Sequence, residues 1–214
     1  MKDIVIAGIA GSGKGTQARA IREYLWSQVQ YFEPGSVYRA LASNDNIAGN
    51  YTKAYTNKWL LVPDGFTQSL IWLVFSCLEP NNTLLVDGFP RMYSQKKMFD
   101  TAMSNAQRDF LVFELVISEQ EAMTRLANRM LCPICWTTYS SLLHGEISTC
   151  PDDGATLQIR DDDRSQEAIQ ERFKLFYQDT KPGLDEYATE GKLIQIDGTQ
   201  SIEAITQEII QHIS

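Results

Sequence analysis

A glycine-rich stretch close to the N-terminus constrains the fold more strongly than any other part of this sequence. Gly8 and the pair Gly13-Lys14 have the spacing of a P-loop, with four residues between the two glycines. The run 4–7 before them is apolar and strand-like, and helical spacing of apolar residues predicts a helix over 15–27. In such a loop the backbone N–H groups and the helix N-terminus converge on an anion. We therefore expect phosphate to bind here, with Lys14 reaching the outer phosphates as a point charge.

The residue after this lysine departs from the common P-loop. Gly15 stands where Ser or Thr usually follows, and the hydroxyl comes one residue later, at Thr16. An ATPase or GTPase would usually carry the hydroxyl directly after the lysine and would need a residue that positions water. Neither is evident in the sequence. A hydrolytic NTPase joined to an interaction module is therefore a weaker hypothesis than a phosphotransferase.

Composition excludes several other classes of protein. The chain has 214 residues, of which 43% are apolar, enough for one core with insertions. Its net charge of −8 argues against a nucleic-acid partner, which would favour a basic surface. No apolar run approaches the ~20 residues of a membrane span, and the N-terminus enters a strand without a signal-peptide pattern. We expect a cytoplasmic protein without a membrane or nucleic-acid partner.

The order of apolar runs and helical patterns predicts an α/β fold. Further strands are expected at 29–32, 83–86, 110–116 and 193–196. Helices are expected at 37–41, 66–78, 94–104, after a Ser118 cap, from about 165, and over 201–213. Strands that alternate with helices imply a doubly wound, five-stranded parallel sheet. Residues 43–58 are polar, rich in Asn and Tyr, and have little potential to contribute to a core.

Charged residues gather near the expected ligand edge of this sheet. Asp87 ends a buried strand, and an acid at that position in P-loop proteins typically holds Mg²⁺ directly or through water. Six arginines lie next to loops, strand ends or an insert: Arg39, Arg91, Arg125, Arg129, Arg160 and Arg172. Planar guanidinium groups suit the equatorial oxygens of a phosphoryl group in transfer. The pattern favours phosphoryl transfer, since no nucleophilic Ser/His/Asp or Cys/His set is apparent.

Residues 129–163 differ in character from the rest of the chain and indicate an inserted subdomain. Two pairs of residues have the x2 spacing of a zinc site: Cys132, Cys135, Cys150 and Asp153. Asp153 is favoured as fourth ligand because it repeats the spacing of the first pair, and His144 is the alternative. Four ligands without an open position imply a structural metal. Cys77 lies in an apolar helix and is expected to be a small core residue.

Taken together, these residues resemble adenylate kinase of the long form with a zinc-bearing lid, over essentially the whole chain. The resemblance rests on the loop 8–17, on Asp87-Gly88-Phe89-Pro90-Arg91 followed by Gln95, on Leu61-Val62-Pro63-Asp64, on the pair Arg125 and Arg129, on the cysteine pattern, and on Tyr177, Thr180, Pro182, Tyr187 and Ile196-Asp197-Gly198. It implies a core of 1–32, 65–128 and 164–214, a helical monophosphate-binding insert of 33–64 and a zinc lid of 129–163.

The resemblance also implies a reaction, in which ATP and AMP give two ADP reversibly, with Mg²⁺ and structural Zn²⁺, in a monomer. Catalytic roles fall to Lys14, Asp87, Arg129, Arg160 and Arg172. ATP binding falls to Gly11, Ser12, Gly13, Lys14, Gly15, Thr16, Arg125, Arg129, Thr138, Tyr139 and Gln200. Monophosphate binding falls to Pro34, Arg39, Leu60, Leu61, Val62, Gly88, Phe89, Pro90, Arg91, Gln95, Arg160 and Arg172.

One segment differs from the family where the monophosphate base is expected. Glu33-Pro34-Gly35-Ser36 replaces the Ser-Thr-Gly-Asp that the family usually has there. Pro34 removes a hydroxyl and an N–H, and Ser36 removes a charge. Two alternatives follow: a nucleoside monophosphate kinase whose base preference is relaxed or shifted from AMP, and a non-catalytic nucleotide-binding relative.

Overall fold

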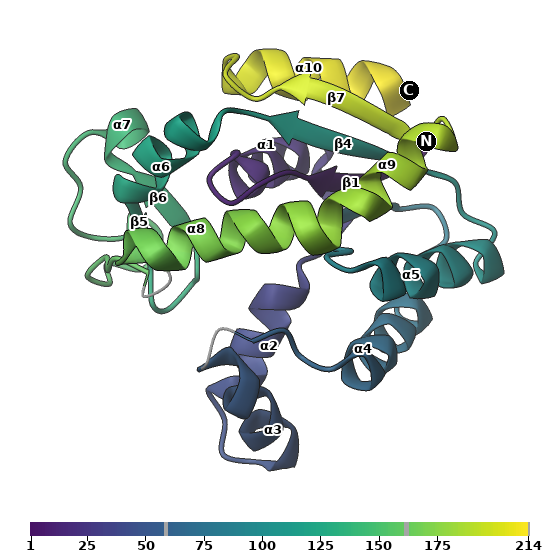
Figure 1. Ribbon diagram of the computed structural model, residues 1–214, viewed down its shortest axis with the longest axis horizontal. Coiled ribbons are helices and arrows are strands. Elements are labelled where there is room, and N and C mark those ends of the chain that lie inside the picture. Colours follow the sequence, from purple (N-terminus) through teal and green to yellow (C-terminus); the bar gives the residue numbers. More distant parts are fainter. Residues whose placement is uncertain (58–59, 161–162, 214) are drawn as a thin grey trace.

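A central parallel sheet of five strands organises the molecule, as expected from the sequence. The computed structural model describes residues 1–57, 60–160 and 163–213. The strand order is β2-β3-β1-β4-β7, so β1 with the phosphate loop at its end lies in the middle (Figure 1). The strands are β1 (Asp3–Ala7), β2 (Val29–Phe32), β3 (Thr83–Asp87), β4 (Phe110–Val116) and β7 (Leu193–Asp197). Parallel pairing places all their carboxyl ends at one edge, where doubly wound sheets bind ligands.

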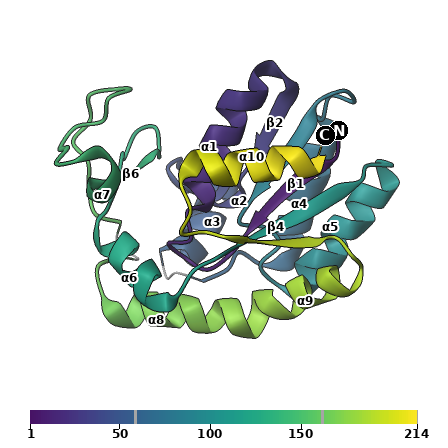
Figure 2. The ribbon, with the colours of Figure 1, turned by 90° about the horizontal axis from the view of Figure 1, so that it is seen from above.

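Two helices cover one face of the sheet. The helix α1 (Lys14–Leu25) follows the loop, and α10 (Ile202–Ile213) closes the chain beside it (Figure 2). Their apolar stripes meet the side chains of β1 and β4, with Ile21 and Ile209 fully buried. Burial of apolar surface stabilises a fold by about 25 cal/mol per Å². The buried face of α1 therefore holds this helix against the sheet, and with it the loop that precedes it.

The opposite face of the sheet is covered by four other helices. These are α4 (Asp64–Ser76), α5 (Tyr93–Asn105), α8 (Gln166–Leu175) and α9 (Lys181–Thr189), with a π-helical turn at Phe176–Thr180 that makes α8 and α9 continuous. Ile169, Phe173 and Phe176 are buried, which confirms the stripe expected after 165. Ser165 caps α8 by accepting a bond from the Ala168 N–H at 3.1 Å. The same capping starts α6 (Glu119–Ala127), where the Glu121 N–H donates to Ser118 Oγ.

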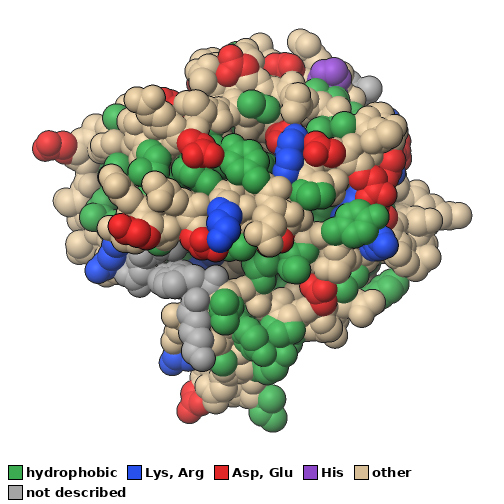
Figure 3. Space-filling model, in the orientation of Figure 1, with side chains coloured by type: hydrophobic (Ala, Val, Ile, Leu, Met, Phe, Trp, Pro, Cys, Tyr) green, Lys and Arg blue, Asp and Glu red, His purple; other side chains and the backbone are tan. Residues whose placement is uncertain are grey.

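The segment between β2 and α4 contains a helix that the sequence reading missed. α2 (Pro34–Ala42) is followed by α3 (Ile47–Thr56), although 43–58 is polar and lacked an expected core role. Asn46 caps α3 by accepting the Gly49 N–H at 2.8 Å. Tyr51 stacks on Phe66 of α4 with ring centroids 5.4 Å apart. Packing of aromatic rings thus holds α3 in place of an aliphatic stripe. Figure 3 shows hydrophobic side chains gathered on the part of the surface formed by α2 to α4.

The inserted subdomain has its own small sheet. β5 (Arg129–Leu131) pairs antiparallel with β6 (Thr138–Ser140), and a short helix, α7 (Ser141–His144), follows. A separate small cluster holds it together: Cys132, Tyr139, Cys150 and Leu157. Both views show this subdomain beyond one end of the main sheet, joined to it by α6 and α8 (Figures 1 and 2).

Cys77 does not belong to the core, contrary to the expectation from its helix. It caps the C-terminus of α4 and is exposed. The apolar spacing continued to this residue, but α4 ends at Ser76 and turns it outward. Among the described residues, no helix is both long and apolar enough to cross a membrane.

Candidate active site

The glycines of the phosphate loop are required by its geometry. Gly13 caps α1 with a φ of 99°, in the left-handed region that favours glycine. At Gly8, which has a φ of 138°, a Cβ atom would lie 2.6 Å from the Leu115 carbonyl oxygen. Lys14 folds back over this loop, and its Nζ donates to the carbonyls of Gly8 and Ile9 at 2.8 Å each. The ammonium group therefore lies at the loop, where the oxygens of an outer phosphate could accept its hydrogen bonds in place of these two carbonyl oxygens.

Lys14 carries an electrostatic cost that a phosphate would relieve. The pKa of Lys14 is lowered to about 7, chiefly by burial, with Arg91 and other arginines adding to the shift and Asp87 opposing it. An incoming polyanion would stabilise the charged ammonium and raise this pKa. A bound phosphate would therefore stabilise the charged form of Lys14 more than it would stabilise that of an exposed lysine.

Asp87 lies at the end of β3 beside the start of α1. Its Oδ2 would be 3.8 Å from a Cβ on Gly15, so the carboxylate faces the loop. The hydroxyl of Tyr31 donates to it at 3.1 Å. Burial raises the pKa of Asp87 to about 6, while Lys14 pulls it down. A buried carboxylate oxygen next to a phosphate loop is a hard donor of the kind that Mg²⁺ prefers, and the position fits such an ion.

Asp163 holds two arginines on the lid side of the site. It accepts two bonds from Arg129, at 2.7 and 2.8 Å, and one from Arg172 at 2.7 Å. Burial lowers the pKa of Arg129 to about 10, and neighbouring Arg160 adds to the effect. These guanidinium groups are close enough to destabilise one another's charge. Such an arrangement is stabilised by a multivalent anion.

Arg91 reaches the same cluster from the other side. Its Nε donates to the Gly88 carbonyl at 2.9 Å, and its backbone N–H donates to Gln95 Oε1 at 3.0 Å. Burial lowers the pKa of Arg91, and Arg172 and Arg160 also lower it. The structure thus brings together five cations that sequence analysis had proposed separately: Lys14, Arg91, Arg129, Arg160 and Arg172.

Arg125 and Arg39 lie at the margins of this cluster with partners of their own. Arg125 Nη2 donates to the Gly198 carbonyl at 3.0 Å, and its Nε donates to Glu121 at 2.7 Å. Arg39, on α2, donates from Nη2 to Glu33 Oε1 at 2.9 Å. Arg125 Nη1 also donates to the Ser12 carbonyl at 3.5 Å, so Arg125 links the phosphate loop to the turn after β7. Arg39 shares its charge with Glu33 at the start of α2.

Several of the proposed contact residues have structural partners within the protein. Phe89 is buried and packs edge-on against Phe99, with centroids 5.9 Å apart. Tyr139 is buried in the lid, and its hydroxyl donates to Asp152 at 3.1 Å, so its ring belongs to the lid core. Gln200 is exposed, with its amide 3.5 Å from Glu208. Three further residues of this group are buried, namely Pro34, Val62 and Pro90, whereas Leu60 and Leu61 are 56% and 38% exposed.

The two half-sites of the lid converge as metal ligands would. Cys132, Cys135, Cys150 and Asp153 present ligand atoms that all lie within 4.8 Å of one another. The Sγ atoms of Cys135 and Cys150 are 3.6 Å apart, close to the separation that tetrahedral Zn–S bonds of ~2.3 Å produce. His144 lies outside this group, with Nδ1 3.0 Å from the Ser140 carbonyl oxygen. The donor set therefore fits a closed, four-coordinate metal site that includes Asp153.

Sequence reasoning missed three residues that complete the site. Tyr31 lies near the end of β2 and Glu33 directly follows this strand, and their positions at a strand end could have marked them. Asp163 belongs to none of the motifs that the sequence presents, and residues 161–162 before it lie outside the described chain. Its role depends on a fold that places it between two distant arginines.

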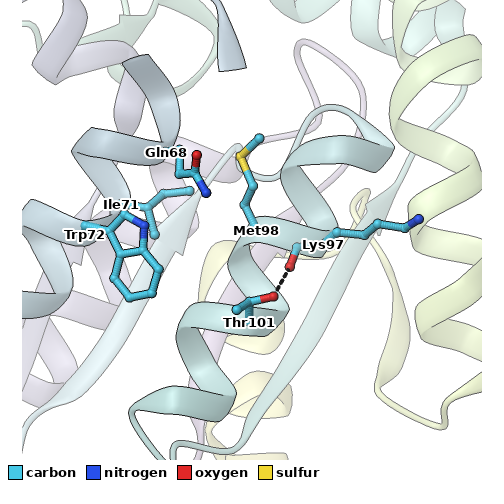
Figure 4. Close-up of a pocket in the computed structure, with 6 residues that line it drawn as sticks. All are labelled: Gln68, Ile71, Trp72, Lys97, Met98 and Thr101. Atoms are coloured by element: carbon cyan, nitrogen blue, oxygen red, sulfur yellow. Dashed lines mark hydrogen bonds between the residues drawn. The ribbon is translucent and has the colours of Figure 1, made fainter. Parts of the chain in front are cut away.

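One surface cavity lies apart from all these residues. It has a volume of about 190 Å³ and is lined by six side chains of α4 and α5 (Figure 4). The Trp72 ring and Met98 face it, and the Lys97 ammonium group points away. None of the proposed nucleotide contacts lines it.

Comparisons with known proteins give a consistent result. A family profile described as adenylate kinase matches residues 6–192. An adenylate kinase of Petrotoga mobilis is 32% identical over 209 residues, covering 96% of this chain and 94% of the relative. An adenylate kinase of Staphylococcus aureus strain Mu50 is 31% identical over 211 residues, with 97% of each chain covered. One of Staphylococcus epidermidis is 30% identical with the same coverage.

Proposed function

From the premise that this chain belongs to the adenylate kinase family, we propose how its residues carry out the reversible transfer of the ATP γ-phosphoryl group to AMP, giving two ADP. The chain is a phosphotransferase by this membership. The observation that carries the mechanism is the convergence of five cations from separate elements on the phosphate loop. A site with this excess of positive charge requires a polyanion, and two phosphorylated substrates supply one.

The ATP phosphates bind to the loop and to the lid-side arginines. Loop N–H groups and Lys14 hold the outer phosphates, since these donors already converge there. Arg129 and Arg172, held by Asp163, follow the charge that develops on the transferring group. Arg160 belongs to the same group of charges. The attacking oxygen of a monophosphate is ionised at pH 7, so no general base is needed.

Asp87 would hold Mg²⁺ directly or through water, and the ion would neutralise charge on the β- and γ-oxygens. Tyr31 orients the carboxylate by donating to it at 3.1 Å. The raised pKa of Asp87 follows from burial and falls when a cation binds beside it.

Monophosphate binding is assigned to Arg39 and Arg91, with Gln95 near the base. Gln95 accepts the backbone N–H of Arg91, which fixes that arginine at the end of β3. A second candidate function, a kinase with a shifted base preference, is favoured by Glu33, whose carboxylate lies 2.9 Å from Arg39 Nη2. An acid here changes both the charge and the hydrogen-bonding character of the monophosphate region.

The remaining assignments concern the frame of the enzyme. We take 33–64 as the monophosphate-binding insert, 129–163 as the lid, and the remainder as the core. Zn²⁺ bound by Cys132, Cys135, Cys150 and Asp153 would hold the lid together, because its own core is small. We also propose that the protein is a cytoplasmic monomer without a nucleic-acid or membrane partner, in line with its net charge of −8.

A coupled assay of ADP formation tests these proposals. The purified protein is incubated with Mg-ATP and, in turn, AMP, CMP, UMP or GMP. Efficient turnover with AMP alone supports the adenylate kinase assignment and removes the shifted preference. Comparable or better turnover with another monophosphate supports the shift. Failure to form ADP from any monophosphate would identify a non-catalytic relative, whereas ADP formation without one would identify a hydrolase.

A further inference from the structure

Trp136 of the lid lies over Arg39 of the monophosphate insert. The guanidinium carbon of Arg39 is 5.4 Å from the centroid of the Trp136 ring, within the range of cation–π attraction. The two residues belong to different inserts and are 97 positions apart in the sequence. The contact therefore joins the lid directly to the residue assigned to the monophosphate.

The backbone at Trp136 is unusual for a bulky residue. Its φ is 62°, in the left-handed region, and its N–H donates to the Cys132 carbonyl at 3.1 Å. The second metal half-site offers an internal comparison, since Gly154 has a φ of 74° and donates to the Cys150 carbonyl at 2.9 Å. Each residue follows the second ligand of its pair. The half-site turn thus needs a left-handed residue, which glycine supplies without strain and tryptophan does not.

The half-site turn does not need the Trp136 ring, so we look for the role of the ring in its contacts with other residues. Backbone strain of this kind persists where the surroundings hold it, commonly at functional sites. Here the Trp136 ring lies over Arg39, and Arg39 Nη2 in turn donates to Glu33 Oε1 at 2.9 Å. The Nε of Arg39 is buried and has no hydrogen-bond partner among the described residues. A ring against the face of the guanidinium group leaves its in-plane N–H donors available to a phosphate.

The contact extends toward the phosphate loop through Glu33 and Tyr31. The Tyr31 hydroxyl donates to Asp87 at 3.1 Å and also lies 3.4 Å from Glu33 Oε2, so its one proton is shared between the two carboxylates. Asp87 faces the loop beside Gly15. The lid tryptophan, the monophosphate arginine and the loop acid are therefore linked across three parts of the fold.

We propose that Trp136 is a positioning residue that couples lid closure to monophosphate binding. ATP bound under the lid would hold the Trp136 ring on Arg39, where the structure already shows it, and would so keep the guanidinium group in place for the monophosphate. ATP then raises the affinity for the monophosphate, and by linkage the monophosphate raises the affinity for ATP by the same factor. This inference rests on the proposed function, because it uses the assigned roles of the lid and of Arg39.

The test is a calorimetric titration of AMP into the protein, with and without a saturating non-hydrolysable ATP analogue and Mg²⁺. If the coupled assay selects another monophosphate, that one replaces AMP. In the wild type, the analogue should lower the AMP Kd by roughly fivefold, the size expected of one exposed cation–π contact. Trp136→Gly should bring this ratio close to one, because without the ring nothing at this position links the lid to Arg39.

Two further variants separate the ring from the turn. Trp136→Phe keeps an aromatic face, whereas Trp136→Leu keeps a bulky left-handed residue without one. The phenylalanine variant should retain most of the coupling and the leucine variant should lose it, at equal zinc content. If Trp136→Gly releases zinc, the comparison of Phe with Leu decides the question.

An unchanged ratio in Trp136→Gly, or an equal ratio in the Phe and Leu variants, would overturn the proposal, and so would the absence of coupling in the wild type. Failure of the proposed function has a different signature, since it appears as absent ADP formation by the wild-type protein.

Discussion

The carboxylate of Asp163 receives both N–H groups of the Arg129 fork, at 2.7 and 2.8 Å, and its side chain is fully buried. A buried paired charge stabilises the fold only while its partner remains, since removing one side leaves the other desolvated. The same carboxylate also accepts a bond from Arg172. Asp163 therefore fixes the position of two arginines that are assigned to the transferring phosphoryl group.

Asp163→Asn is expected to lower both activity and stability. Asn keeps one neutral acceptor oxygen but removes the carboxylate charge that the two guanidinium groups share, so the unfolding free energy should fall by roughly 3–5 kcal/mol. Misplaced arginines should lower kcat by about 10²-fold, the cost of a lost transition-state donor. Urea unfolding and steady-state kinetics measure the two effects. Asp152→Asn, on the exposed side of the lid, is the control and should change kcat little.

Glu33→Gln is expected to improve monophosphate binding. The carboxylate of Glu33 lies 2.9 Å from Arg39 Nη2 and therefore competes with a phosphate for that cation. Removing the charge should lower the KM for the monophosphate a few-fold, because a partly exposed ion pair such as this one is worth about 1 kcal/mol or less. The KM for ATP should stay unchanged. A higher monophosphate KM would show instead that Glu33 contacts the substrate favourably.

Removal of metal should unfold the lid but not the core. The lid has only a small apolar cluster, and structural zinc contributes roughly 10–16 kcal/mol of apparent binding free energy in comparable peptides. A chelator should make the region around 129–163 sensitive to protease and raise the KM for ATP, while the main thermal transition persists. Asp153→Cys should retain the metal and Asp153→Ala should lose it, as measured by metal analysis of the purified variants. Retained protease resistance after complete metal removal would count against a structural metal.

A buried lysine between α5 and α9 should make stability depend on pH. Lys96 is paired with Asp100 at 2.8 Å, Glu190 at 2.9 Å and Glu186 at 3.4 Å, and its side chain is 3% exposed. The pKa of Glu190 is lowered, because its bonds to Lys96 and Lys192 outweigh burial. A lowered folded-state pKa gives stability that is present above the unfolded value of about 4.5 and is lost as the pH falls through the folded value.

Lys96→Met removes the cation from this group. At pH 7 it should lower the unfolding free energy by less than the roughly 3–5 kcal/mol of a fully buried pair, because the carboxylates are partly exposed. The difference from wild type should shrink as the pH is lowered toward 4, since protonated carboxyls no longer repel one another. Urea unfolding from pH 4 to 8 measures this. Lys97→Met, whose ammonium group points away from the neighbouring cavity, is the matched control.

The sequence alone determined the fold class, the phosphate loop and the family. Those conclusions depend on residues close together in the chain: the glycine spacing before Lys14, the apolar strand runs and the paired ligand spacing of the lid. Local spacing sets backbone geometry directly, so it can be read without the fold. The same reasoning failed where a local pattern was ambiguous, as with the polar helix α3, which forms through a cap at Asn46 and aromatic contacts, and with Cys77, where the helix ends one residue earlier than its apolar spacing suggested.

Only the tertiary structure decided which distant charges meet. Asp163 with Arg129 and Trp136 above Arg39 are pairs without a fixed sequence spacing. Their proximity follows from the parallel sheet, which gathers strand ends at one edge, and from two inserts that approach each other over that edge. Electrostatic and cation–π energies depend on distance and burial rather than on order in the chain, so the sequence supplied the groups and the fold determined their partners.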